Sequence, residues 1–180
     1  MTSPPNASER LIIYPTSNRG SQWSPAAYSP RAHDFYVMGV NEAASYSTRE
    51  VIPYKPGTPV TGQVMGGRLG FMMNQEENSI PLSGTLSAVN VDTGKIDWQH
   101  KTDLPMVGGV LATAGELVFT GEMNGNLDAF NASNGKKLWA FNLGATVGAP
   151  PITYRVRGVQ YIAVAAGGLS ANGWPRLMAK

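Results

Sequence analysis

Two copies of one pattern, 41 residues apart, constrain the fold of this 180-residue chain more than any other feature of its sequence. Residues 84–98 can be laid over residues 125–139, and the copies share Gly, Leu, Ala, Asn, Gly, Lys and Trp at seven equivalent positions. A period of about 40–45 residues is typical of β-propellers, in which each repeat forms a four-stranded blade. The spacing therefore predicts an all-β fold containing tandem propeller blades.

Each copy has the pattern of a β-hairpin. The shared Leu, Ala and Asn occupy alternate positions, as the side chains on one face of a strand do. The following turns, Asp92-Thr93-Gly94 and Ser133-Asn134-Gly135, each supply a Gly that accepts positive φ. The second strand of each hairpin carries the Trp, Trp98 or Trp139, and for both we favour packing between sheets over a catalytic role.

Further strand patterns at 117–121, 151–154 and 160–165 indicate two complete blades and parts of others. Because two or three blades cannot close a ring, we expect the chain to be part of a larger propeller. The expected organisation is an N-terminal extension (1–18), a partial blade with a long irregular insertion (19–83), tandem repeats with part of a closing blade (84–168) and a C-terminal tail (169–180).

Composition excludes several classes of function. A net charge of +2 without a cluster of Lys or Arg argues against a nucleic-acid partner. The absence of cysteine excludes disulfides, thiolate metal sites and the Cys-x-x-Cys-His attachment of a c-type haem. The apolar run 161–166 is much shorter than the roughly 20 residues of a membrane span. The first residues lack the pattern of a signal peptide, which leaves a cytoplasmic location or a missing start as alternatives.

Several segments between about Arg19 and Pro175 together match a known family in their order and approximate spacing. They are Gln22–Pro30, Phe35–Asn41, Val107–Gly121, Gly125–Trp139, Gly148–Tyr154, Gln160–Gly168 and Gly173-Trp174-Pro175. In this combination they resemble the C-terminal part of the alcohol and methanol dehydrogenases that depend on pyrroloquinoline quinone (PQQ). A single Gly-Lys…Trp hairpin would be weak evidence, since unrelated propellers reuse it.

The resemblance implies the late blades of an eight-bladed propeller, with PQQ near its axis and a calcium or lanthanide ion beside the quinone. It also implies periplasmic oxidation of a primary alcohol to an aldehyde, with a cytochrome c as electron acceptor and the rest of the propeller as a partner. The family's metal ligands and catalytic Asp lie on segments without a counterpart here, so we expect the isolated chain to be inactive. A non-catalytic propeller scaffold of the outer-membrane assembly type is the alternative.

Three residues match positions that lie at or beside the quinone in this family. Gln22 stands where relatives have an Asn that contacts the quinone, and a polar loop residue is the alternative. Trp23 is the second half of that pair, either beside the cofactor pocket or packed in the core under a loop. Val107 replaces a Trp that precedes the Gly-Gly pair, which leaves an aliphatic contact. We assign no catalytic or metal-ligating residue. Solvated carboxylates are expected at Asp34, Asp92, Asp97, Asp103 and Asp128, and surface or loop positions at His33 and His100.

Overall fold

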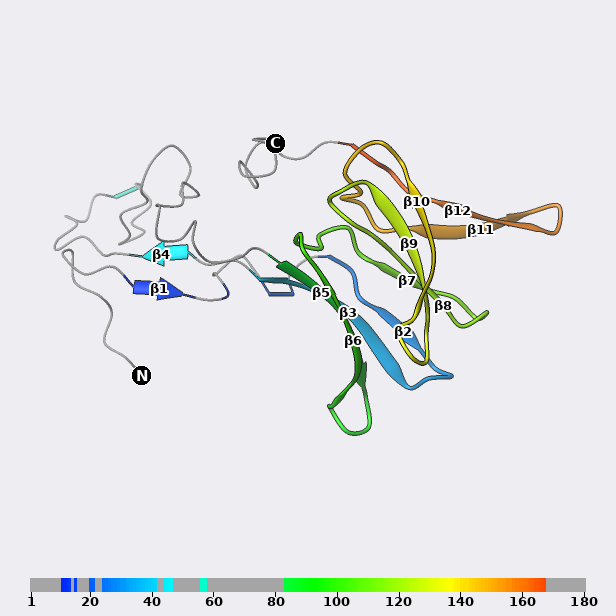
Figure 1. Ribbon diagram of the computed structural model, residues 1–180, viewed down its shortest axis with the longest axis horizontal. Coiled ribbons are helices and arrows are strands. Elements are labelled where there is room, and N and C mark those ends of the chain that lie inside the picture. Colours follow the sequence, from blue (N-terminus) through cyan, green and yellow to red (C-terminus); the bar gives the residue numbers. More distant parts are fainter. Residues whose placement is uncertain are drawn as a thin grey trace.

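A computed structural model describes residues 11–13, 15, 20–21, 24–41, 44–46, 56–57 and 83–167 of the chain. Every regular element among these residues is a β-strand, and every pair of neighbouring strands is antiparallel. The strands form two four-stranded sheets and two two-stranded pairs (Figure 1). The predicted all-β fold with four-stranded antiparallel sheets is therefore confirmed.

The first four-stranded sheet, which we call the first blade, has the strand order β2-β3-β5-β6. Its strands are β2 (Ala27–Ser29), β3 (Asp34–Asn41), β5 (Ser83–Asn90) and β6 (Ile96–Thr102). β3 pairs with β5 along its whole length, although residues 42–82 separate the two strands in sequence. Within that separation β4 (Ala44–Tyr46) pairs with β1 (Leu11–Ile13).

The second blade contains four consecutive strands in the order β7-β8-β9-β10. They are β7 (Val110–Ala112), β8 (Leu117–Gly121), β9 (Asn126–Asn131) and β10 (Lys137–Asn142). A separate hairpin follows, formed by β11 (Ile152–Val156) and β12 (Val159–Ala163), and it projects away from the second blade in Figure 1. The two copies of the sequence pattern are thus the third and fourth strands of consecutive blades.

The hydrophobic core lies between facing surfaces of the two blades. Tyr36 and Leu86 of the first blade and Val118 and Phe130 of the second are fully buried in one cluster. In a strand whose two faces both contact other sheets, side chains of both alternating sets are removed from water. β9 shows this arrangement, because its four central residues are all buried.

Trp98 joins the blades through both its ring and its N–H group. Its Nε1 donates a hydrogen bond to the Ala132 carbonyl at 2.8 Å, and the Tyr36 hydroxyl donates to the same oxygen at 3.1 Å. The indole also covers Gly135, where a Cβ atom would lie 2.6 Å from Trp98 Cδ2. The predicted packing role thus holds for Trp98, which lies partly buried against the core.

Trp139 occupies the equivalent position in the second blade but is 48% exposed. Its ring stacks on Phe141 at a centroid distance of 6.0 Å. The β11–β12 hairpin is exposed as well, with Tyr154 stacked on Tyr161 at 5.4 Å. No complete third blade covers this face among the described residues, so the packing of Trp139 between sheets stays a prediction.

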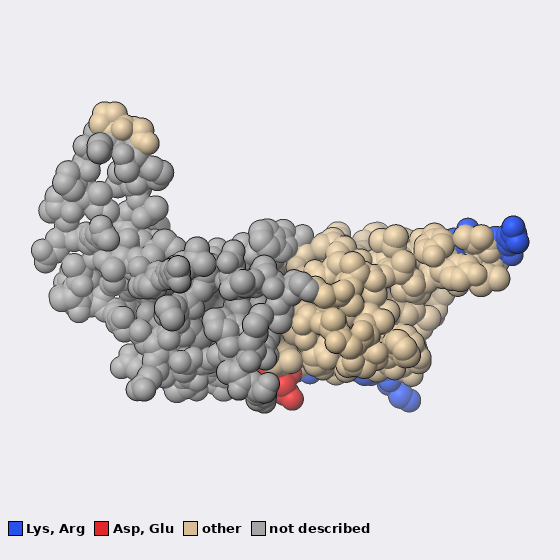
Figure 2. Space-filling model, turned by 90° about the horizontal axis from the view of Figure 1, so that it is seen from above, with Lys and Arg blue, Asp and Glu red and all other residues tan. Residues whose placement is uncertain are grey.

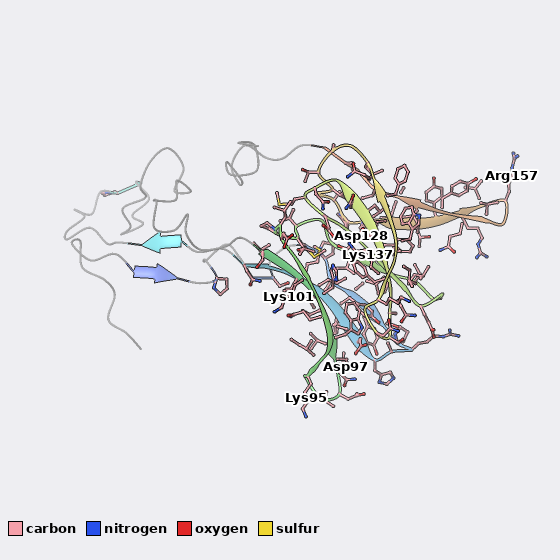
Figure 3. The ribbon with its side chains drawn as sticks, in the orientation of Figure 1. Lys95, Asp97, Lys101, Asp128, Lys137 and Arg157 are labelled. Carbon is pink, nitrogen blue, oxygen red and sulfur yellow. The ribbon has the colours of Figure 1, made fainter. Side chains whose placement is uncertain are left out.

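Charged side chains do not gather on the described part of the face shown in Figure 2. Its described part is mostly uncharged, with Lys and Arg toward the edges, and Arg157 lies at the tip of the β11–β12 hairpin (Figure 3). No helix in the described part of the chain has the length and hydropathy needed to cross a membrane.

Candidate cofactor wall between the blade entries

The segments that lead into the first strands of successive blades lie side by side. Val110 N, at the start of β7, donates a hydrogen bond to the Pro25 carbonyl at 3.0 Å, just before β2. A Cβ atom at Gly109 would meet both Pro25 and Pro150, which precedes β11. The segments that precede β2, β7 and β11 therefore lie close together, at the edge where each sheet has its first strand.

The Gly108-Gly109 pair is what allows this close approach. A Cβ atom at Gly108 would lie 2.7 Å from the Val147 carbonyl oxygen. Gly109 has a φ of +104°, and its Cβ would lie 2.7 Å from Pro150 Cβ and 3.0 Å from Pro25 Cδ. Real side chains do not tolerate such distances, and an L-residue rarely adopts this φ. Glycine is thus required at both positions by the packing of neighbouring entry segments.

Three hydroxyl groups donate hydrogen bonds to backbone carbonyls in the segment 104–109, which contains Val107. Thr102 Oγ1 donates to the Leu104 carbonyl at 2.6 Å, and Ser24 Oγ donates to the Val107 carbonyl at 2.7 Å. Thr120 Oγ1 is fully buried and donates to the Gly109 carbonyl at 3.0 Å. Because the donors come from three separate parts of the chain, they fix the segment from several directions. Sequence patterns gave no signal for these contacts.

Of the three predicted cofactor contacts, Val107 lies in the described part of the chain, whereas Gln22 and Trp23 lie outside it. Val107 is half-buried and packs, together with Leu104, against Val40 and Met123. Ser24 immediately follows Trp23 in sequence, so the Ser24–Val107 hydrogen bond ties Val107 to the chain next to the predicted pair. Val107 is thus a half-buried aliphatic side chain on a backbone held by hydrogen bonds.

A second group of polar side chains lies in the second blade, with two buried carboxyl groups, Glu122 and Asp128, beside the partly exposed Lys137. Lys137 Nζ lies 2.6 Å from Asp128 Oδ2 and 3.1 Å from Glu122 Oε1 (Figure 3 labels Asp128 and Lys137). The Asn124 amide donates to Glu122 Oε2 at 2.8 Å. Asp128 is fully buried, and the Lys137 ammonium group faces its Oδ2.

These contacts change the pKa values of the three groups. Burial raises the pKa of Asp128 to about 7, and the neighbouring Glu122 adds to the rise while Lys137 opposes it. Burial also acts to raise the pKa of Glu122, but Asp128, Lys137 and Asn124 together bring it below its usual value. For Lys137, burial alone lowers the pKa, yet the two carboxyl groups raise it above its usual value.

The expectation of solvated carboxylates is wrong for Asp128 and also for Asp34, which is buried at the start of β3. Burial raises the pKa of Asp34, and Asp97 contributes in the same direction. His100 also differs from its predicted surface or loop position, because it lies within β6 and its ring packs against the Phe130 ring, with the two ring centroids 4.9 Å apart. Burial, followed by the charge of Lys137, lowers the pKa of His100. No group of three or more metal-ligating side chains occurs among the described residues.

Comparison with known proteins identifies relatives of the chain. Residues 1–162 match the family model described as the PQQ glucose/ethanol/alcohol dehydrogenase β-propeller domain. The quinoprotein alcohol dehydrogenase PedE of Pseudomonas putida is 43% identical over 148 residues, which are 82% of this chain and 22% of the relative. The quinoprotein ethanol dehydrogenase of Pseudomonas aeruginosa is 41% identical over 148 residues, with the same coverage.

Solved structures agree with this assignment. The quinohemoprotein alcohol dehydrogenase ADHIIG of Pseudomonas putida HK5 superposes with a TM-score of 0.78 at 28% identity, covering 89% of this chain and 24% of that one. The chain thus spans about a quarter of the length of the proteins that it matches. Its two four-stranded sheets correspond to part of a propeller of this kind.

Proposed function

The chain belongs to the PQQ-dependent glucose/ethanol/alcohol dehydrogenase β-propeller family, and we propose that it supplies consecutive blades of a quinoprotein alcohol dehydrogenase. Within the complete protein, these blades contribute part of the quinone pocket to an enzyme that oxidises a primary alcohol to an aldehyde. The observation that carries the proposal is the convergence of the entry segments beside Val107, held by the Ser24 hydroxyl and the Gly108-Gly109 pair.

Val107, Gln22 and Trp23 are the proposed quinone contacts in this chain. The bound quinone would supply the two-electron acceptor that alcohol oxidation requires. Val107 fits one apolar wall, because its half-buried aliphatic side chain sits on a backbone fixed by hydrogen bonds. Gln22 would donate its amide N–H to an oxygen of the quinone, and Trp23 would pack beside the pocket. This chain provides no proposed catalytic base.

The exposed face of the second blade supports a role within a larger ring. Trp98 and Trp139 are equivalent in the repeat, and Trp98 is covered by the second blade. Trp139 and Phe141 present a similar apolar surface that remains exposed. Exposed aromatic surfaces of this kind mark interfaces. The rest of the propeller is therefore the proposed partner of this face.

The remaining assignments follow from relatives. A calcium or lanthanide ion is proposed beside the quinone, and one solved structure similar to the chain is a europium-containing methanol dehydrogenase. A cytochrome c is the proposed electron acceptor, since the names of a butanol-oxidising and a methanol-oxidising relative include it. A periplasmic location is proposed for the complete protein from its family. A non-catalytic assembly scaffold is not favoured, because the family model and the relatives described above are dehydrogenases.

A chimera tests the proposal directly. The chain replaces the matching segment of the PedE dehydrogenase, and PQQ binding and alcohol-dependent dye reduction are measured in the presence of calcium or a lanthanide. We expect the chimera to bind PQQ and oxidise a primary alcohol, while the isolated 180-residue chain does neither. Val107→Asp in the chimera should weaken PQQ binding by at least about tenfold, because it places a charge against an aromatic ring system.

Ala114→Asp is the matched control, since Ala114 lies in the exposed turn between β7 and β8. This variant should bind PQQ like the parent chimera. A chimera that folds and binds PQQ equally well with Val107→Asp would refute the placement of Val107 in the pocket. A folded chimera that binds no PQQ would refute the proposed function itself.

A further inference from the structure

The charges of the buried carboxyl groups of Glu122 and Asp128 are not balanced by Lys137, whose side chain is 34% exposed. If both carboxyl groups are ionised, one lysine faces two negative charges, and the buried group is left with a net negative charge. One proton shared by the two carboxyl groups makes the group neutral. Because an unpaired charge away from water is costly, the folded structure favours the state that holds this proton. Asp128 is the group that would accept it, because its carboxyl group is fully buried with Lys137 Nζ 2.6 Å from Oδ2, whereas Glu122 also accepts from the Asn124 amide.

We propose that Glu122, Asp128 and Lys137 form a proton-dependent lock that holds strand β10 in place while one shared proton is present and releases it when that proton is lost. The lock acts on β10 because Lys137 is the first residue of that strand. Among the described strands, β10 is also the outermost strand of its sheet and pairs with β9 alone. It can therefore move outward and admit water to Asp128 without breaking a second strand pairing.

The groups around Asp128 come from every element packed against it. Lys137 approaches from β10 and Glu122 from the loop between β8 and β9, while Thr120 of β8 lies directly opposite Asp128 in the strand register. Across the blade interface lies His100 of β6, whose ring contacts Phe130. Lys137 Nζ lies 5.5 Å from the centre of the same Phe130 ring. Movement of Lys137 would thus loosen the joint between the blades at Phe130.

The first blade provides an internal comparison. In the 41-residue repeat, Asp128 corresponds to Ser87 and Lys137 to Ile96. The strand register agrees, because Ile96 pairs with Val89 as Lys137 pairs with Phe130. The fourth strand of the first blade, β6, therefore has the same architecture without the charged lock.

The sign of the pH effect follows from the titration of Asp128. The folded chain binds this proton more tightly than the unfolded chain, so the stabilisation is complete below the unfolded pKa of about 4 and is lost as pH rises from there to about 7. Glu122 acts oppositely, since its lowered pKa gives a contribution that disappears as pH falls through its folded value. His100 has a lowered pKa, so its penalty appears when pH falls below its unfolded value of about 6.5. The Glu122 effect lies below about pH 5. His100 opposes Asp128 between pH 5 and 7, and comparison with Asp128→Asn cancels its effect because that variant keeps His100.

The test measures the unfolding equilibrium of the full 180-residue chain in urea at pH 5 and pH 7. With a folded pKa of about 7 for Asp128 and an unfolded value of about 4, the Asp128 proton should contribute a rise of about 50-fold in the unfolding equilibrium constant across this window. Asp128→Asn, which keeps the side-chain shape but cannot ionise, should lack this contribution. The double variant Asp128→Ser/Lys137→Ile copies the pair found in the first blade and should lack it as well. Asp103→Asn, at an exposed position, is the matched control and should keep the full rise.

Amide hydrogen exchange separates the lock from a general loss of stability. After correction for intrinsic exchange rates, protection in β10 should fall more between pH 5 and 7 than protection in β6. If the Asp128 variants do not fold, ¹³C NMR of the side-chain carboxyl in the unaltered chain reports its titration directly. The proposal is overturned if Asp128 titrates below about pH 5, if the unaltered chain and Asp128→Asn change stability equally between pH 5 and 7, or if β10 and β6 lose protection equally.

Discussion

Replacing each repeat Trp by Ala should have unequal effects, although the two positions are equivalent in sequence. Trp98 donates a 2.8 Å hydrogen bond to Ala132 and packs against Tyr36 and Gly135. Truncation of a large buried aromatic side chain costs about 3–5 kcal/mol, and the ring of Trp98 is only partly buried, so we expect about 2–4 kcal/mol. For Trp139→Ala we expect a loss of less than about 1 kcal/mol, since the ring is half-exposed and stacks on the exposed Phe141.

The measurement is urea unfolding of the 180-residue chain, followed by far-ultraviolet circular dichroism at pH 6. Trp98→Phe separates the contributions, because it keeps most of the apolar surface and removes the N–H donor. It should cost about 1 kcal/mol, the typical net contribution of one hydrogen bond. The Ala132 carbonyl keeps its contact with the Tyr36 hydroxyl in this variant.

In the PedE chimera, Trp139→Ala should become as costly as Trp98→Ala, because the rest of the ring would then cover the second blade. Equal costs for the two variants in the isolated chain would refute the reasoning. They would mean that the position in the repeat, and not the neighbouring structure, sets how much each Trp contributes to the free energy of unfolding. Unchanged low cost of Trp139→Ala in a folded chimera would contradict the proposed packing of this face.

Two further predictions concern glycine. Gly109→Ala should destabilise the isolated chain by at least about 2 kcal/mol in urea unfolding, because it combines a φ of +104° with overlap of Pro25 and Pro150; a cost below about 0.5 kcal/mol would contradict the crowding of the entry segments. Gly135→Ala should cost at least about 1 kcal/mol more than Gly94→Ala, since the two turns have φ values of +68° and +69° but a Cβ atom meets the Trp98 ring at Gly135 and open space at Gly94. Thermal unfolding of both variants would show equal losses if the Trp98 contact were absent.

Parts of the candidate site could be anticipated from the sequence and parts could not. The Gly108-Gly109 pair and its neighbour Val107 were recognisable as a motif, and the structure gives that motif a physical reason in the crowding around Pro25 and Pro150. The hydroxyl contacts from Ser24 and Thr120 were not predictable, because no local pattern relates Ser24 to a carbonyl 83 residues away. The proposed contacts at Gln22 and Trp23 remain predictions.

The buried charges illustrate the same division. In sequence, Asp128 alternates with the apolar Leu127 and Ala129, which indicates a side chain facing water if only one face of the strand is buried. In the structure both faces of β9 are covered, so Asp128 lies in the interior beside Lys137 and Glu122. Alternation shows that a segment is a strand, but not whether its second face meets water or another sheet.

The sequence by itself determined the hairpins, the 41-residue period and the all-β class, because backbone pairing and glycine-containing turns depend on residues close together in the chain. Tertiary structure decided the pairing of β3 with β5 across residues 42–82, the burial of Asp128 and the different environments of Trp98 and Trp139. These outcomes depend on which surface covers which, and burial is a property of neighbours that may be distant in sequence. Two identical residues at equivalent repeat positions therefore have different physical roles in the same chain.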